Sequence, residues 1–126
     1  MKKLMCALAV LMLTCSPAQA LFMGTLQREA WTLEIASASL DTTAVTVYYL
    51  GNGLQVIEIM SVPAADTVQQ VFAKPGKNVR RIIIEVDPPT NGALFGQATA
   101  RIVQGANQFI DIISDLHDAR LVFDVE

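Results

Sequence analysis

Apolar and polar residues alternate with a period of two along most of this chain, and helical periodicity is nearly absent. The final stretch, RLVFDVE over residues 120–126, shows the pattern most clearly, because Leu121, Phe123 and Val125 share one face. Such alternation is typical of a β-strand that turns one face to a core and the other to water. The pattern therefore predicts an all-β fold.

Turn-forming sequences rich in Gly, Pro, Asn and Asp separate the alternating runs at intervals of about ten residues. One of them, Gly51-Asn52-Gly53, is expected to supply the positive φ angles of a tight hairpin. Short strands at this spacing predict a small antiparallel β-sandwich. We expect about eight strands, over residues 25–36, 43–50, 54–62, 67–73, 79–87, 97–104, 108–113 and 119–125.

At the level of architecture, this arrangement resembles an immunoglobulin-like or fibronectin-like sandwich, with a small jelly roll as the alternative. The Cys–Trp–Cys pattern of immunoglobulin domains is missing, and Trp31 is expected to be a core residue. No motif of a known family can be carried over to this chain. Its function is therefore argued from candidate sites.

The first twenty residues have the features of a secretory signal peptide. Lys2 and Lys3 precede an apolar run, and the following SPAQA ends in the A-x-A spacing that a signal peptidase reads. The run is shorter than the roughly 20 apolar residues that cross a bilayer. We therefore expect a cleaved signal peptide over residues 1–20, a single domain over residues 21–126, and a bacterial protein that is periplasmic or secreted.

Both cysteines, Cys6 and Cys15, lie in the expected signal peptide. The exported domain would then contain neither a disulfide nor a reactive thiol. Lipidation of Cys15 is the alternative to cleavage after Ala20. The preceding residues 12–14, MLT, differ from a lipobox, which has Leu, a small residue and then Gly or Ala, so cleavage is favoured.

The charge balance argues against several classes of partner. The chain carries 9 Lys and Arg against 12 Asp and Glu, and loss of Lys2 and Lys3 makes it more acidic. An acidic domain without a dense basic face is unsuited to nucleic acid or to an anionic membrane. No second long apolar segment follows the signal peptide, so we expect no transmembrane segment after processing.

Three carboxylates and the single histidine lie close together near the end of the chain. Asp111, Asp115 and Asp118 are a candidate calcium site, but the order D-x-[DN]-x-[DN]-G is missing, and a polar turn is favoured. Zinc would prefer more than His117 alone. Ser114, His117 and Asp118 supply the residue types of a catalytic triad, yet sequence adjacency is not triad geometry and no G-x-S-x-G is present. We expect no enzyme activity and no cofactor.

Two expected strands are apolar on both faces. In LQVIEIMSV, Val56 and Met60 are assigned to one face together with Leu54, and in RRIIIEV, Ile83 shares its face with the polar residues Arg81 and Glu85. A strand with one wet face does not need these residues, and exposing each one forgoes roughly 1.5–3 kcal/mol of burial. The pattern is therefore consistent either with covered strands or with an apolar patch for a partner protein or a second copy. The apolar Leu21-Phe22-Met23 at the expected mature start adds to such a patch.

A basic cluster and one tyrosine complete the candidates. KPGKNVRR places Lys77 and Arg81 near a Pro-Gly turn, where they would bind an anionic group, or would form a solvated hairpin end with Arg81 paired across the sheet. The hairpin end is favoured. Tyr48, beside the Gly51 turn, is the best candidate for a contact with a sugar or a peptide.

These observations predict an exported, non-catalytic binding or assembly module of the bacterial envelope that engages a protein partner. The alternative is a carbohydrate or calcium-dependent ligand binder, and a small hydrolase is disfavoured. The binding candidates are Tyr48, Val56, Met60, Ile83, Lys77 and Arg81.

Overall fold

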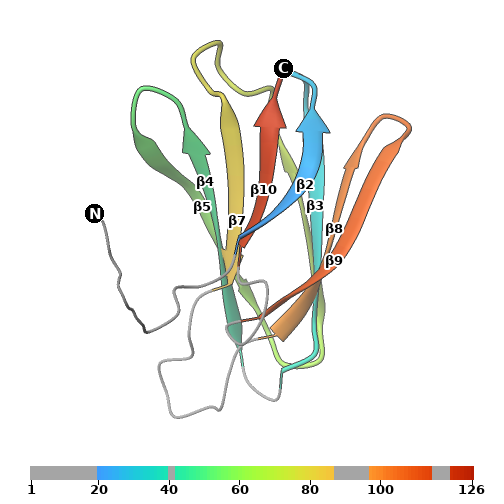
Figure 1. The fold of residues 1–126 in the computed structure, drawn as a ribbon. Coiled ribbons are helices and arrows are strands. Elements are labelled where there is room, and N and C mark those ends of the chain that lie inside the picture. The colour runs from blue at the N-terminus through green and yellow to red at the C-terminus, as the bar shows by residue number, and fades with distance from the viewer. Residues whose placement is uncertain (1–19, 40–41, 87–96, 115–119) are drawn as a thin grey trace.

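The computed structural model describes residues 20–39, 42–86, 97–114 and 120–126. These residues form nine strands in two sheets that pack face to face, with no helix among them (Figure 1). The expected all-β sandwich is confirmed. The strands are β2 (Ala20–Leu26), β3 (Trp31–Ser37), β4 (Thr43–Leu50), β5 (Leu54–Val62), β6 (Thr67–Phe72), β7 (Arg81–Val86), β8 (Gln97–Gln104), β9 (Asn107–Ser114) and β10 (Arg120–Val125).

The larger sheet has the order β2-β10-β7-β4-β5, and the smaller one has the order β6-β3-β8-β9. All neighbouring strands are antiparallel except β2 and β10, which are parallel. The four edges are therefore β2 and β5 in one sheet and β6 and β9 in the other. No helix in the described ranges has the length and apolar character to cross a membrane.

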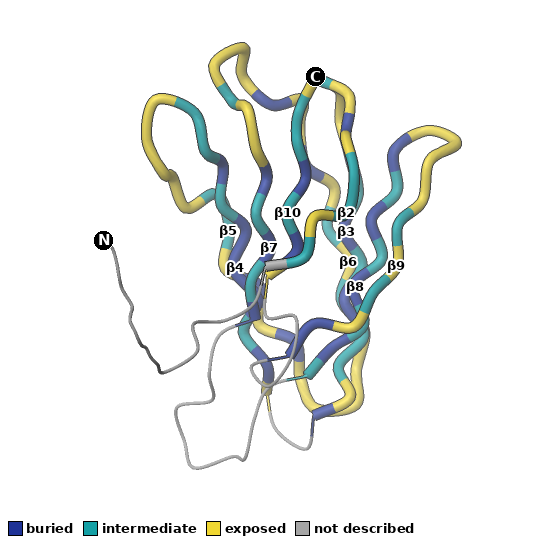
Figure 2. Tube along the Cα trace, in the orientation of Figure 1, coloured by how far each residue is buried: buried dark blue, intermediate teal, exposed yellow. Residues whose placement is uncertain are grey.

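Buried and less buried residues alternate along most strands, which is the pattern that the sequence predicts (Figure 2). The inward faces of both sheets form one apolar core. Trp31, 1% exposed, stacks on Phe72 at a ring-centroid distance of 4.3 Å, so its expected core role is confirmed. Burial of such large side chains is the main stabilising contribution in a domain without a disulfide.

One expected strand is in fact two. Residues 25–36 were predicted as a single strand, but β2 ends at Leu26 and β3 begins at Trp31 in the other sheet. The side chain of Gln104 holds the bend between them: its Oε1 accepts a hydrogen bond from Gln27 N at 2.7 Å, and its Nε2 donates to Gln27 O at 2.9 Å and to Glu29 O at 3.2 Å. Because Gln104 is distant in sequence, no local pattern marks this break.

The expected positive φ angles at Gly51-Asn52-Gly53 are wrong. Positive φ angles occur at Gly24, Ala65 and Gly105 among the described residues. Gly105, with φ +58°, is the first residue of the short loop between β8 and β9, where a type II′ hairpin needs such an angle. Glycine is required at Gly51 for a different reason, because a Cβ there would collide with the backbone of Asn78.

A candidate binding face on the five-stranded sheet

A row of mostly apolar side chains crosses all five strands on the outer face of the larger sheet. The register pairs Phe22 of β2 with Val122 of β10, Val122 with Ile83 of β7, Ile83 with Tyr48 of β4, and Tyr48 with Val56 of β5. Side chains directly opposite each other lie about 4.5–5.5 Å apart at Cβ, so these residues form a continuous surface. We call these five residues the outer row.

The outer row faces solvent because its sequence neighbours face the core. Leu121 and Phe123 flank Val122, and Ile82 and Ile84 flank Ile83, and all four flanking side chains are fully buried. The two ends of the row are the most exposed, Phe22 at 57% and Val56 at 53%, while the three residues between them are partly buried. On edge strand β5, Leu54 and Ile59 are also exposed and widen the apolar surface next to Val56.

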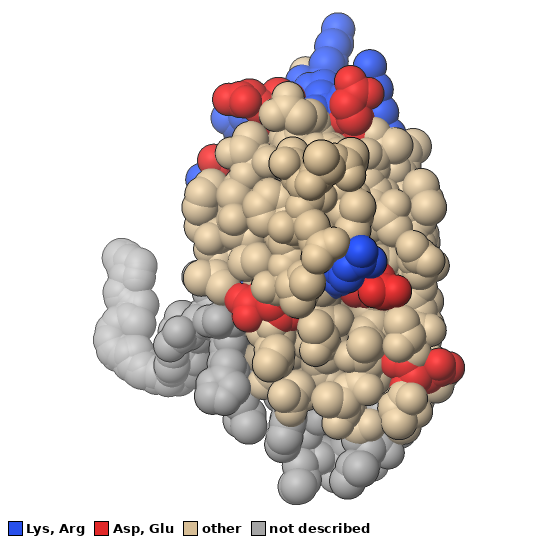
Figure 3. Space-filling model, turned by 90° about the vertical axis from the view of Figure 1, so that its right-hand side faces the viewer, with Lys and Arg blue, Asp and Glu red and all other residues tan. Residues whose placement is uncertain are grey.

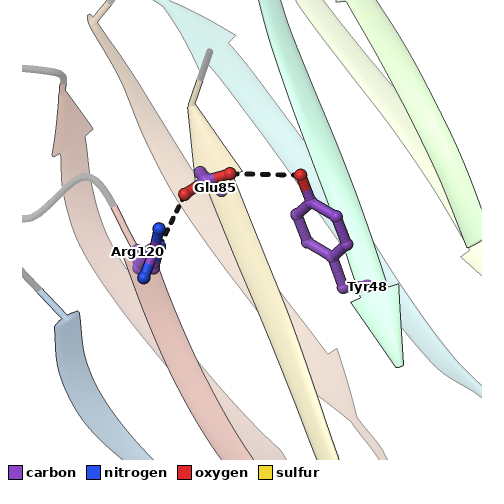
Figure 4. A network of polar contacts seen from close by, with 3 residues as sticks. All are labelled: Tyr48, Glu85 and Arg120. Carbon is purple, nitrogen blue, oxygen red and sulfur yellow. Dashed lines mark hydrogen bonds and ion pairs between the residues drawn. The ribbon is translucent and has the colours of Figure 1, made fainter. Parts of the chain in front are cut away.

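A polar network from three adjacent strands borders the outer row (Figure 4). Arg120 Nε donates to Glu85 Oε2 at 2.5 Å, and the Tyr48 hydroxyl donates to Glu85 Oε1 at 3.2 Å. The Glu85 side chain is only 18% exposed, and both of its carboxylate oxygens accept hydrogen bonds. The network therefore holds the Tyr48 ring in one orientation beside Ile83.

These polar residues, together with two apolar ones, surround a hollow of about 160 Å³ on the same face. The hollow is lined by Tyr48, Leu54, Ile83, Glu85 and Arg120. Sites for small-molecule ligands usually measure about 300–1,000 Å³. A hollow of this size suits one large side chain of a partner better than a cofactor or a free ligand.

A larger hollow, of about 550 Å³, lies at the end of the sheet where β10 finishes. Its charged groups are already paired or balanced: Arg81 Nε contacts Asp124 Oδ1 at 3.0 Å, and Arg80 Nη2 donates to Gly51 O at 3.1 Å. Glu126 adds a further negative charge to the lining. This arrangement does not favour an anionic ligand.

The outer face of the smaller sheet has no comparable row. Figure 3 shows this side of the molecule as a largely uncharged surface, with a basic and an acidic group side by side near its middle and further acidic groups below them. Its exposed apolar residues are separated by polar ones, because Ile110 lies opposite Arg101, which in turn pairs with Glu34 at 3.5 Å. Val71, which is 69% exposed, lies opposite Thr32. Continuity of apolar side chains, rather than absence of charge, therefore distinguishes the two faces.

The structure brings three of the predicted binding residues together, since Tyr48, Val56 and Ile83 are consecutive members of the outer row. Phe22, which the sequence placed at an apolar mature start, ends the same row. Sequence reasoning missed Val122 and the Glu85–Arg120 pair, because their positions depend on pairing between distant strands.

The assignment of Met60 to the same face as Val56 is wrong. Met60 is 3% exposed and belongs to the core. The register pairs Val47 with Glu58 but Tyr48 with Val56, so Ile57 is an extra residue in a β-bulge. A bulge reverses the alternation beyond it, which is why counting by two fails here.

The hairpin expected at the basic cluster is wrong, because the segment joins β6 and β7, which lie in different sheets and are not paired, although the expected ion pair of Arg81 is present. Arg81 pairs with Asp124 across neighbouring strands β7 and β10, as the favoured alternative predicts. Lys77 is exposed in the segment before β7. Arg28, which sequence reasoning did not include, donates to the Gly76 carbonyl and joins this end of the molecule.

Of the candidate calcium ligands, the structure describes only Asp111. Its Oδ1 accepts a hydrogen bond from the Ile112 amide at 2.7 Å. Asp115 and Asp118 lie outside the described residues, as does His117. Within the described part of the chain, no group of three or more His, Cys, Asp or Glu residues is placed to hold a metal ion.

Comparison with known proteins found no matching family model, no matching curated protein and no matching solved structure. The outer row and its polar network are therefore the features from which a function can be argued.

Proposed function

We propose that this chain is an exported, non-catalytic binding or assembly module of the bacterial envelope, and that it engages a protein partner through the outer face of its larger sheet. The observation that carries the proposal is the outer row: five neighbouring strands each contribute one side chain to a continuous, mostly apolar surface. Contiguous exposed apolar surface is typical of protein interaction sites.

The chemistry of the face supports a protein as the partner. Tyr and Arg are enriched among the residues that dominate binding energy at protein interfaces, and this face presents Tyr48 and Arg120 in a preformed network. Covering Phe22 and Val56, which are 57% and 53% exposed, would remove further apolar surface from water, and the gain for each would be about half of the roughly 1.5–3 kcal/mol for burial from full exposure. Export is supported by the basic start, the apolar run and the A-x-A spacing before residue 21.

The test is a crosslinked pull-down from the envelope fraction of the source cells, using the full chain with a C-terminal tag. Val56→Ser removes an exposed member of the outer row, and Val71→Ser makes the same change at an exposed position of the opposite sheet. We expect one envelope protein to be captured by the native chain and by Val71→Ser, and to be reduced about tenfold with Val56→Ser, which corresponds to a loss of about 1.4 kcal/mol.

Two results would contradict the proposal. Equal capture by both variants would show that the partner binds elsewhere. If the native chain repeatedly captures no envelope protein, a protein partner would be rejected, and the alternative class of glycan or small-ligand binders would be favoured.

A further inference from the structure

The edges of the two sheets differ in how well their backbones are protected. An unprotected edge strand presents N–H and C=O groups that can pair with a strand of another chain. On β9, the Ile112 amide is already bonded to Asp111 Oδ1. On β6, the Thr67 amide donates to Asp66 Oδ1 at 2.7 Å.

Edge strand β2 is protected by its irregular backbone. Its register with β10 shifts by one residue between Phe22 and Gly24, and Gly24 has a φ of +149°. A bulge bends an edge and interrupts regular pairing. Each of these three edges therefore has one local feature that interrupts regular pairing with a further strand.

The fourth edge, β5, is the longest strand of the described residues, with nine residues. It contains no Pro, Lys or Arg, the residues that most often protect an edge strand. Like β2, it contains a bulge, at Ile57, but the five residues Glu58–Val62 beyond it stay in unbroken register with β4, whereas the shift in β2 leaves three paired residues on either side. The exposed residues Leu54, Val56 and Ile59 place the apolar surface directly along this edge.

The negative charge of Glu58 favours a basic residue in a strand that pairs with this edge. Glu58 is the single charged residue of β5 and lies opposite buried Val47, and its carboxylate has no ion-pair partner among the described residues. A basic side chain on an added strand would lie across from it, and opposite charges at such positions stabilise strand pairing.

We propose that the protein partner adds an extended segment to the edge of β5. Its backbone hydrogen-bonds to β5, its apolar side chains continue the outer row beyond Val56, and a basic residue lies beside Glu58. This inference rests on the proposed function and names the form of the partner that the edge accepts. Recognition by strand addition draws affinity from backbone hydrogen bonds and specificity from alternate side chains.

The test uses two acetylated and amidated nine-residue peptides in which Thr and Val alternate around a central residue, Lys in one and Glu in the other. Binding to the purified chain is followed by NMR titration and by amide hydrogen exchange. We expect the Lys peptide to shift and protect amides of β5, and to bind about fivefold tighter than the Glu peptide.

Variants of Glu58 distinguish recognition of the peptide's charge from nonspecific binding of the peptides. Glu58→Lys should reverse the preference between the two peptides, and Glu58→Gln, which keeps the side-chain shape, should abolish it. An unchanged preference in both variants, or protection that falls on β2, β6 or β9 instead, would overturn the inference. Dimerisation of the chain alone through β5, seen by sedimentation, would overturn it in favour of a second copy.

The two proposals fail in distinguishable ways. If Val56→Ser abolishes capture of the envelope protein while neither peptide affects the β5 amides, the proposed function stands and strand addition is rejected. If the native chain captures no envelope protein, the protein partner itself is rejected, regardless of whether the peptides bind to β5.

Discussion

Gly24 of β2 lies directly against the ring of Phe109 of β9, so that a Cβ at Gly24 would be 2.9 Å from Phe109 Cε1. Phe109 also meets Phe123 edge to face, at a centroid distance of 5.2 Å. Gly24 follows the bulge where β2 has one more residue than β10. Its backbone φ of +149° is an angle that residues other than glycine rarely adopt. This contact closes the sandwich on the side where β2 and β9 are the edges.

Gly24→Ala should therefore destabilise the fold, through both the strained backbone and the overlap with Phe109. We expect the free energy of unfolding, measured by urea titration, to fall by about 1–3 kcal/mol. Gly53→Ala is the matched control, because nothing lies within 4 Å of a Cβ there and Gly53 has no positive φ. The control should be neutral or stabilising by up to about 1 kcal/mol. Equal losses in both variants would contradict this account of Gly24.

A second prediction concerns the contribution of a buried hydrogen bond in the core to stability. Trp31 Nε1 donates to the Tyr49 hydroxyl at 3.0 Å. Tyr49→Phe leaves the indole N–H without its acceptor, and an unsatisfied buried donor costs about 1–3 kcal/mol of stability. Urea titration of this variant at pH 7, with Tyr48→Phe on the outer face as a comparison, measures the difference. A smaller loss for Tyr49→Phe than for Tyr48→Phe would reject the core hydrogen bond as the more important one.

The same hydroxyl gives the fold a pH dependence in alkali. Burial raises the pKa of Tyr49 above its usual value near 10, and the hydrogen bond from Trp31 opposes this shift by lowering it. Below about pH 10 the folded and unfolded states are both protonated, so Tyr49 contributes no slope. Above it the unfolded state ionises first, and the free energy of unfolding falls as the pH rises toward the folded-state pKa. Tyr49→Phe should lose this part of the alkaline slope, and an identical slope in both proteins would contradict the prediction.

The Glu85 carboxylate should contribute more to stability than the Asp124 carboxylate. Glu85 accepts from two side chains and is 18% exposed, whereas Asp124 makes one ion pair with Arg81 and is 46% exposed. Exposed pairs contribute about 0–1 kcal/mol and are screened by salt. We expect Glu85→Gln to lower the free energy of unfolding by about 1 kcal/mol, and Asp124→Asn to change it by less than about 0.5 kcal/mol. Urea titrations at low and high salt test the order, and the reverse order would reject the network as a stabilising unit.

The alternation of apolar residues was enough to predict the all-β sandwich and most of its inward faces. Leu121 and Phe123, which the sequence assigns to one face, are both fully buried, and Trp31, which is expected in the core, is 1% exposed. Local alternation reports which way a side chain points relative to its neighbours, which is the information that a core requires. It carries no information on which strand lies beside which.

The remaining features depend on contacts between distant residues. Gln104 fixes the bend after Leu26, so the break between β2 and β3 leaves no local trace. The outer row depends on the order of five strands, and so Tyr48, Val56 and Ile83 could be named as candidates but not placed side by side. Only Phe22 carried a local signal for the far end of the row, as an apolar residue near the expected mature start.

The last prediction concerns the bulge in β5. Because of the bulge, Val56 and Met60, which sequence alternation assigns to one face of the strand, lie on opposite faces. Val56 is 53% exposed at the end of the outer row, and Met60 is 3% exposed in the core. Met60→Ser should therefore lower the free energy of unfolding by about 2–5 kcal/mol, through lost burial and a cavity, while Val56→Ser should change it by less than about 0.5 kcal/mol. Urea titration of both variants measures the contrast. Similar losses at the two positions would mean that Val56 and Met60 share one environment, which a strand without the extra residue Ile57 would produce.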